Sequence, residues 1–137
     1  MMATLEGHCL CGKVSYSSTS EPLATLICHC KNCQRQAGAA FSINVVVPTD
    51  SITSTGTLKT FKDNADSGNT VDREFCPECG SPLFSKPSAN AGITVIKAGT
   101  LNDTSALAPG LQLWCDSAQN WVHLDDKLTS FPGNMPG

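Results

Sequence analysis

Alternating hydrophobic and polar positions recur along the chain and predict short β-strands. The clearest alternation spans residues 13–17, where Val14 and Tyr16 point to one face and their polar neighbours to the other. Further runs rich in β-branched or aromatic residues lie at 25–28, 41–47, 57–61, 70–75, 93–96 and 111–115. Clusters of Pro, Gly, Asn and Asp separate these runs. Because no long helical segments alternate with the strands, the pattern favours a mostly antiparallel β domain.

One segment has the composition of a helix. Residues 31–37 consist largely of good helix formers, and Gly38 follows them at the position where a left-handed residue commonly ends a helix. This segment allows about two turns. We therefore expect a mainly β fold with one short helix.

Length and composition narrow the class of protein. A chain of 137 residues with 40% hydrophobic and 15% charged residues fits one soluble globular domain. The nine Lys and Arg are scattered along a chain of net charge -3, which argues against a nucleic-acid partner. The sequence contains no apolar run long enough to cross a membrane and begins with no signal-like segment, so we expect a cytoplasmic protein.

The eight cysteines are the main clue to chemistry, because a reducing compartment keeps thiols free for metal binding or catalysis. They fall into four groups: Cys9-x-Cys11, Cys28-x-Cys30-x-x-Cys33, Cys76-x-x-Cys79 and Cys115. The last lies in the predicted strand 111–115, in phase with Leu111 and Leu113, so we interpret it as a buried structural thiol.

The first and third groups together predict a four-thiolate zinc site. On an extended segment Cys9 and Cys11 point to the same side, which suits two thiolates that converge on one ion better than a disulfide. The two-residue spacer of Cys76 and Cys79 lets the chain turn so that both sulfurs face inward. The alternative is that these thiols are free or disulfide-bonded in an extracellular scaffold.

The second group offers three thiolates within six residues. Three protein ligands with a fourth position left open are typical of catalytic zinc, so Cys28, Cys30 and Cys33 are candidate catalytic ligands. His29 would be the nearest fourth ligand, but on an extended segment it points away from its neighbours. The alternative role of His29 is that of a hydrogen-bond donor, either at the surface or to the residues that support the metal ligands.

These residues resemble a known family. The resemblance is carried by Gly7-x-Cys9-x-Cys11-Gly12-x-Val14-x-Tyr16, by Cys28-x-Cys30-x-x-Cys33-x-Arg35 with Gly38, by Phe75-Cys76-x-x-Cys79-Gly80-Ser81, by Ala98-Gly99-Thr100-Leu101, and by Trp114-x-x-Ser117 with Trp121. The sequence is similar to the glutathione-dependent formaldehyde-activating enzymes from about residue 7 to 131, which implies a single domain over 1–137.

That resemblance implies an Mss4-like, tent-shaped β fold with two zinc sites. The structural zinc would be held by the residues matching Cys9, Cys11, Cys76 and Cys79, and the catalytic zinc by those matching Cys28, Cys30 and Cys33. The implied reaction joins glutathione and formaldehyde as S-hydroxymethylglutathione, and in reverse it is a carbon–sulfur lyase reaction. Glutathione, or another thiol, and a small aldehyde are thus the expected partners.

Two points remain open at the level of sequence. Lys31 and Arg35 lie beside the three-cysteine group and would ease the binding of an anionic thiol, or they form only a solvated helix face. The protein is expected to be a zinc-dependent lyase, and the alternatives are a non-catalytic thiol carrier, a partner-binding module of Mss4 type, or a redox or metal sensor.

Overall fold

The computed structural model describes residues 4–64 and 68–134. Within these residues, eleven strands and four short helices follow one another along the chain: β1 (Leu5–His8), β2 (Ser15–Ser18), β3 (Ala24–Cys28), α1 (Lys31–Ala37), β4 (Ser42–Pro48), η1 (Thr49–Ser51), β5 (Ile52–Thr55), β6 (Lys59–Asn64), β7 (Thr70–Phe75), β8 (Pro82–Pro87), β9 (Ile93–Lys97), η2 (Ala98–Thr100), β10 (Leu111–Leu113), η3 (Cys115–Ser117) and β11 (Thr129–Ser130). None of the helices in the described ranges is long and apolar enough to cross a membrane.

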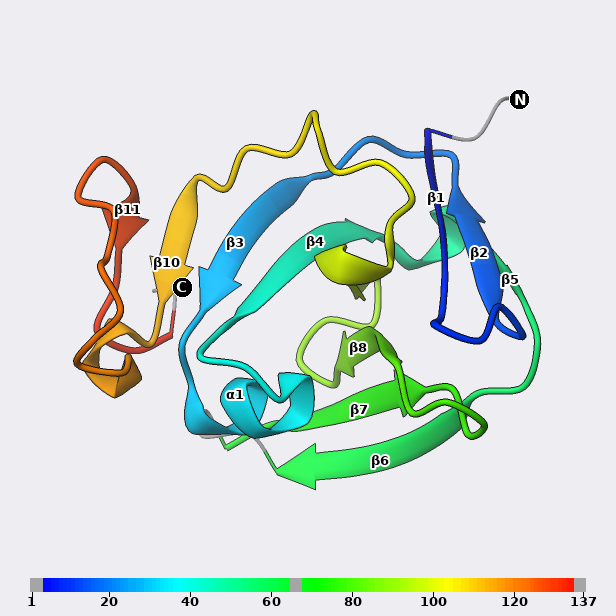
Figure 1. The fold of residues 1–137 in the computed structure, drawn as a ribbon, viewed down its shortest axis with the longest axis horizontal. Helices are drawn as coiled ribbons and strands as arrows, with labels where there is room; N and C mark the ends of the chain where they lie inside the picture. Colours follow the sequence, from blue (N-terminus) through cyan, green and yellow to red (C-terminus); the bar gives the residue numbers. More distant parts are fainter. Residues whose placement is uncertain (1–3, 65–67, 135–137) are drawn as a thin grey trace.

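The strands form two sheets, which Figure 1 shows curving around the centre of the molecule. The small sheet has the order β1-β2-β5, and the large sheet has the order β11-β10-β3-β4-β9-β8-β7-β6. Most neighbours are antiparallel, as the sequence predicts, but β10 runs parallel to both β3 and β11. The large sheet is mixed because the chain crosses from β9 to the far side of β3 before it forms β10.

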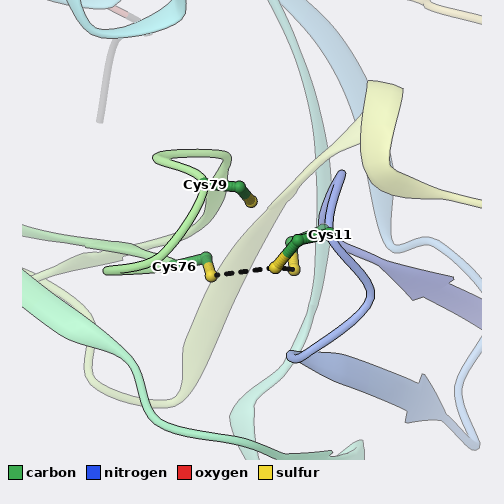
Figure 2. A group of neighbouring side chains, drawn as sticks. Cys11, Cys76 and Cys79 are labelled. Carbon is green, nitrogen blue, oxygen red and sulfur yellow. Dashed lines mark hydrogen bonds between the residues drawn. The ribbon is translucent and has the colours of Figure 1, made fainter.

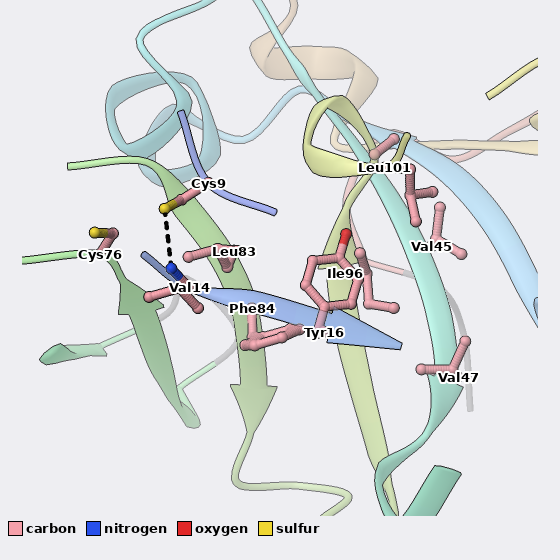
Figure 3. Close-up of a cluster of buried hydrophobic side chains, with 11 residues drawn as sticks. Cys9, Val14, Tyr16, Val45, Val47, Cys76, Leu83, Phe84, Ile96 and Leu101 are labelled. Atoms are coloured by element: carbon pink, nitrogen blue, oxygen red, sulfur yellow. Dashed lines mark hydrogen bonds between the residues drawn. The ribbon is translucent and has the colours of Figure 1, made fainter. Parts of the chain in front are cut away.

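One face of the large sheet packs against the small sheet and forms the main hydrophobic core. Val45, Phe84 and Ile96 lie on this face. Tyr16 of β2 and Val14, which directly precedes β2, pack against it from the small sheet (Figure 3). The Tyr16 and Phe84 rings meet edge to face, with centroids 5.1 Å apart. The alternation predicted for residues 13–17 thus places Val14 and Tyr16 together in the core.

The opposite face of the large sheet carries a different set of side chains, because successive residues of a strand point to opposite sides. Leu26 of β3, Asn44 of β4 and Lys97 of β9 stand next to one another across the strands. One row further along the sheet, Val46 pairs with Val95. This second face bears the candidate site.

The predicted elements agree with the structure for α1, whose bounds are those expected, and approximately for β2, β3, β4, β6, β7 and β9. α1 ends at Gly38, whose φ of 64° lies in the left-handed region. Four strands were not predicted: β1, β5, β8 and β11.

Two predictions about cysteine-bearing segments are wrong. The segment around Cys9 and Cys11 is a tight turn rather than an extended segment, closed by a hydrogen bond from Gly12 N–H to the Cys9 carbonyl (3.1 Å). The predicted strand 111–115 ends at Leu113, because Trp114 adopts a φ of 57°. Cys115 therefore begins η3 and is half-buried, not a core residue in phase with Leu113.

Candidate metal centres

Four cysteine sulfurs come together where the turn after β1 meets the turn after β7. The sulfurs of Cys9, Cys11, Cys76 and Cys79 all lie within 4.8 Å of one another. Figure 2 shows the labelled side chains converging from these two turns. The cluster links the small sheet, through β1 and β2, to the turn between β7 and β8 of the large sheet.

Both turns are shaped by a glycine just after the second cysteine. Gly12 has a φ of 81° and Gly80 a φ of 80°, a region that residues with a side chain rarely adopt. Gly80 N–H donates to the Cys76 carbonyl at 2.8 Å, which closes the second turn. The glycines thus let each pair of sulfurs face the same point.

Backbone and hydroxyl groups favour the thiolate form of Cys9 and Cys79. A hydrogen bond from the Lys13 backbone acts in the same direction on Cys11, but burial and the neighbouring thiols raise the pKa of Cys11 to about 11. Val14 N–H donates to Cys9 Sγ at 3.3 Å. Hydrogen bonds from the hydroxyl and the backbone N–H of Ser81 lower the pKa of Cys79 to about 5. These donors would also stabilise thiolates that bind a metal ion.

The spacing of the sulfurs fits a metal ion. Cys11 Sγ lies 3.6 Å from Cys9 Sγ and 3.8 Å from Cys76 Sγ. A tetrahedral ion with metal–sulfur bonds of about 2.3 Å holds its sulfurs about 3.8 Å apart. Four soft thiolate donors at this spacing could hold a metal ion, and zinc or an iron–sulfur centre are the groups that such donors select.

A second cluster lies at the junction of β3 and α1. Cys28 ends β3, Cys30 caps the N-terminus of α1, and Cys33 lies in its first turn. All three are buried, and their sulfurs also lie within 4.8 Å of one another. Cys33 N–H donates to Cys30 Sγ at 3.3 Å, so the start of the helix fixes one sulfur of the group. The three thiolates could hold a metal ion and leave one of its positions to another ligand.

This second cluster opens onto a cavity of about 370 Å³ on the second face of the large sheet. Its walls are mainly apolar and include Leu26, Val46 and Val95. Trp114 also lines it, and the left-handed backbone of this residue is a strained conformation. The first cluster has no part in this lining.

Two buried cations line the same cavity. Arg73 is 4% exposed, and its Nε donates to Asp63 at 2.8 Å, an ion pair that Asn32 supports by donating to the same carboxylate. Lys97 is 6% exposed and donates to Asn44 Oδ1 at 3.2 Å. Arg73 therefore has a carboxylate partner, whereas Lys97 donates to a neutral amide.

The two cations act on the second cluster. Hydrogen bonds from the Cys28 and Cys30 thiols lower the pKa of Cys33, and the positive charges of Lys97 and Arg73 lower it further. Contacts with the Cys30 and Cys33 thiols raise the pKa of Cys28, and burial adds to this effect. One thiolate, that of Cys33, is thus favoured in the free cluster, and the charges of both cations stabilise it.

The remaining candidate residues lie outside the cavity lining. His29 is 1% exposed, with its Nε2 3.3 Å from Gln112 Oε1 and its ring against Phe41, so it is not a surface residue. Lys31 and Arg35 are exposed and line a separate, shallow hollow on the outer face of α1. Cys115 belongs to neither cysteine cluster.

Sequence reasoning missed Arg73 and Lys97. Arg73 lies within the predicted strand 70–75, and Lys97 directly follows the predicted strand 93–96; neither belongs to a recognisable motif. Strand alternation could have indicated Lys97. It lies two residues after Val95, so its side chain points to the same side of the strand as that of Val95. Their meeting with Cys33 depends on strand order, which the sequence does not show.

The fold and the two clusters define a class: a small, mainly β protein with two cysteine groups that could each hold a metal ion. The model of one family, "Glutathione-dependent formaldehyde-activating enzyme", matches residues 4–117. The chain belongs to this family, as the motifs in the sequence predict.

Individual relatives are more distant. A protein of Talaromyces marneffei with the provisional name of glutathione-dependent formaldehyde-activating enzyme is 30% identical over 79 residues, which are 58% of this chain and 42% of that relative. One of Emericella nidulans with the same provisional name is 32% identical over 58% of this chain and 40% of its own length. The matches thus span about two fifths of these curated relatives.

A solved structure supports the fold alone. The crystal structure of a Rhodobacter sphaeroides protein matches with a TM-score of 0.57 and 19% identity, over 76% of this chain and 91% of that one.

Proposed function

We propose that this protein is a zinc-dependent enzyme that joins a thiol to a small aldehyde and splits the adduct in the reverse direction. Glutathione and formaldehyde are the substrates that the family name suggests, and another thiol is equally compatible with the chemistry. In the forward direction the thiol sulfur bonds to the carbonyl carbon, the C=O bond becomes a C–OH bond, and the thiol proton ends on the oxygen. The reaction needs no oxidant.

The observation that carries this proposal is the position of the second cluster at the wall of the cavity. Cys28, Cys30 and Cys33 would hold a catalytic zinc ion, and they line a space large enough for a small substrate. A bound zinc ion would stabilise the thiolate form of a substrate thiol and lower its pKa. Cys9, Cys11, Cys76 and Cys79 would hold a structural zinc ion with no position open.

Lys97 and Arg73 supply positive charge where the adduct would form. Three thiolates and one divalent zinc ion carry a net charge of about -1, which Lys97 offsets from within the cavity wall. In our proposal its ammonium group donates a hydrogen bond to the oxygen that develops negative charge as sulfur attacks. Asn44 holds that ammonium in place.

Lys31 and Arg35 remain candidates for contacts to the carboxylates of a peptide thiol. Because both line the outer hollow, such contacts would form outside the cavity. All the cysteines are free thiols, which suits the reducing cytoplasm that we propose as the location of the protein.

The test combines metal content with reaction rate. Elemental analysis of the purified protein should give two zinc ions per chain, and a Cys30→Ser variant should give one. Cys115→Ser is the matched control, since its thiol belongs to neither cluster, and it should keep both ions. NMR exchange spectroscopy should show adduct formation from glutathione or 2-mercaptoethanol and formaldehyde above the spontaneous rate, in proportion to enzyme concentration.

Other outcomes identify the alternatives. Thiol binding without any rate increase would identify a carrier, and two zinc ions without thiol binding would favour a partner-binding module. One zinc ion that survives Cys30→Ser would contradict the catalytic site.

A further inference from the structure

The walls of the cavity identify the kind of thiol that fits it. On the second face of the large sheet, Ala24, Val46 and Val95 stand side by side on β3, β4 and β9. Leu113 and Trp114 line the cavity from the β10 side. A ligand that reaches the cysteine cluster therefore lies against aliphatic and aromatic surface over most of its length.

Part of the lining is polar, and the cations and one hydroxyl in it come from neighbouring segments of the large sheet. Arg73 pairs with Ser85 across β7 and β8, and Ser85 pairs with Val95 across β8 and β9. Ser85 is buried, and its hydroxyl has no hydrogen-bond partner among the described residues. Arg73, Ser85 and Lys97 offer donors inside the cavity. The other polar lining residues are neutral, and the remainder of the wall is apolar.

The same distribution disfavours glutathione inside the cavity. Glutathione carries two carboxylates and one ammonium group, and a charged group buried without a partner costs several kcal/mol. Among the described lining residues only Arg73 and Lys97 are charged, and Arg73 already has Asp63 as its partner. No carboxylate is available in this lining for the ammonium group of glutathione.

The volume of the cavity also favours a ligand smaller than glutathione. About 370 Å³ lies near the lower end of the roughly 300–1,000 Å³ of pockets that enclose drug-sized ligands. We propose that the cavity selects a compact thiol with an apolar body, bound as its aldehyde adduct, in preference to the charged tripeptide glutathione. This inference rests on the proposed function for the identity of the reacting groups.

In the bound adduct, the sulfur lies at Cys28, Cys30 and Cys33, and the hydroxyl formed from the aldehyde faces Ser85 and Lys97. The unpaired Ser85 hydroxyl then gains a partner, which removes the cost of a buried unsatisfied group. The apolar body covers Val46 and Val95, and its transfer from water contributes roughly 25 cal/mol for each Å² buried.

The test is a titration of the zinc-loaded protein by calorimetry with three thiols: 2-phenylethanethiol, 2-mercaptoethanol and glutathione. We expect 2-phenylethanethiol to bind at least tenfold more tightly than glutathione, with 2-mercaptoethanol between them or weaker. Val46→Phe should weaken 2-phenylethanethiol at least tenfold, because the added ring fills the cavity. Ile43→Phe is the matched control on the same strand; Ile43 is partly exposed and outside the lining, so its substitution should leave the affinity unchanged.

A second variant keeps the test valid if Val46→Phe does not fold. Val46→Thr has nearly the same volume and places a hydroxyl in the apolar wall, so it should weaken 2-phenylethanethiol severalfold and leave 2-mercaptoethanol unchanged. Equal or tighter binding of glutathione, or an affinity for 2-phenylethanethiol that neither Val46 variant changes, would overturn the inference.

Reaction rates separate this inference from the proposed function. If glutathione binds best and its adduct forms faster than spontaneously, the selection for apolar thiols is wrong and the enzyme assignment stands. If 2-phenylethanethiol binds through Val46 but no thiol shows accelerated adduct formation, the cavity assignment stands and the enzyme assignment is wrong. If no thiol binds to the zinc-loaded protein, both are wrong.

Discussion

At the scale of single residues, the contact between Gly7 and Tyr16 explains why a glycine begins the first cysteine motif. A Cβ atom at position 7 would lie 2.4 Å from both the Tyr16 hydroxyl oxygen and the Thr100 carbonyl oxygen. The Tyr16 hydroxyl in turn lies 2.6 Å from Thr100 Oγ1. Gly7 is therefore required by close packing of β1 against β2 and η2.

This packing predicts that Gly7→Ala lowers the free energy of unfolding by about 1–3 kcal/mol, the usual cost of overpacking. Gly99→Ala is the matched control, since a Cβ there would meet nothing within 4 Å. Denaturant unfolding of both variants checks the prediction. Equal stability of the two would show that β1 can shift away from Tyr16 at little cost.

Tyr16 gives a prediction about pH, because it is the only tyrosine in the chain. Burial raises the pKa of its phenol to about 12, although the hydrogen bond with Thr100 opposes this effect. The folded protein thus prefers the neutral phenol, and the stability that Tyr16 contributes is complete below about pH 10 and is lost as the pH rises towards 12.

Ultraviolet absorbance of tyrosinate should accordingly remain low at pH 10–11 in the folded protein and rise near 12. Tyr16→Phe should lose less stability than the wild type between pH 10 and 12. A tyrosinate signal centred at pH 10 in a folded sample would contradict the burial of this hydroxyl.

At the scale of elements, Gln34 fixes α1 to its surroundings. Its Nε2 donates to the carbonyl oxygens of His29 (2.6 Å) and Ser117 (3.0 Å), and its Oε1 accepts from Gln119 (2.6 Å). The side chain therefore joins the helix to the segment between Cys28 and Cys30 and to η3. Gln34 thus fixes the position of α1 relative to the segment that carries Cys28 and Cys30.

Gln34→Ala leaves the buried His29 carbonyl without this donor, so we expect a loss of about 1–3 kcal/mol in unfolding free energy. Zinc at the second cluster should dissociate faster, with the first cluster unaffected. Gln36→Ala on the same helix is the control, because Gln36 Oε1 has no partner among the described residues. Competition with a chromophoric chelator measures both dissociation rates, and equal rates in the two variants would contradict this role of Gln34.

The same elements show how far sequence reasoning reaches. The helix 31–37 could be predicted because its composition and Gly38 are local signals. β8 was missed because Pro82 and Pro87 at its ends resemble turn signals, and β5 because its side chains are largely exposed. The two cysteine clusters followed from spacing, whereas the turn at Cys9 depends on the hydrogen bond that Gly12 makes.

The cations of the candidate site could not be predicted, since they come from strands that are far apart in the sequence. Arg73 on β7 and Lys97 on β9 face the cluster between β3 and α1 only through the order of strands in the large sheet. Lys31 and Arg35, which are close to the cysteines in sequence, lie on the outer face of the helix instead. Proximity along the chain was a poor guide to proximity in space at this site.

At the scale of the whole molecule, the two faces of the large sheet have different roles. Its first face packs on the small sheet as a core, and its second face carries the cavity. The four-cysteine cluster lies on the side of the core and joins the two sheets. The three-cysteine cluster lies at the cavity, with a separate group of buried residues around it that includes Leu26 and Leu113.

If each cluster holds a metal ion, as we propose, this division predicts different consequences for the loss of the two ions. A metal ion at the first cluster closes a long loop of chain between Cys11 and Cys76, so its binding free energy is also folding free energy. Cys76→Ser should therefore lower the midpoint of thermal unfolding by about 10 °C or more, since several kcal/mol are lost and each is worth about 3–4 °C in a chain of this size. Cys30→Ser should lower it by only a few degrees, because its cluster spans six residues of one local segment.

Thermal unfolding followed by circular dichroism, with and without a strong chelator, measures this difference. Chelation should reduce the stability of the wild type and of Cys30→Ser by similar amounts, because both retain the first cluster, and should change Cys76→Ser much less. If Cys30→Ser and Cys76→Ser proved equally unstable, the second cluster would be holding the fold as well. It would then be a closed structural site, and a free coordination position for substrate at the cavity would no longer be expected.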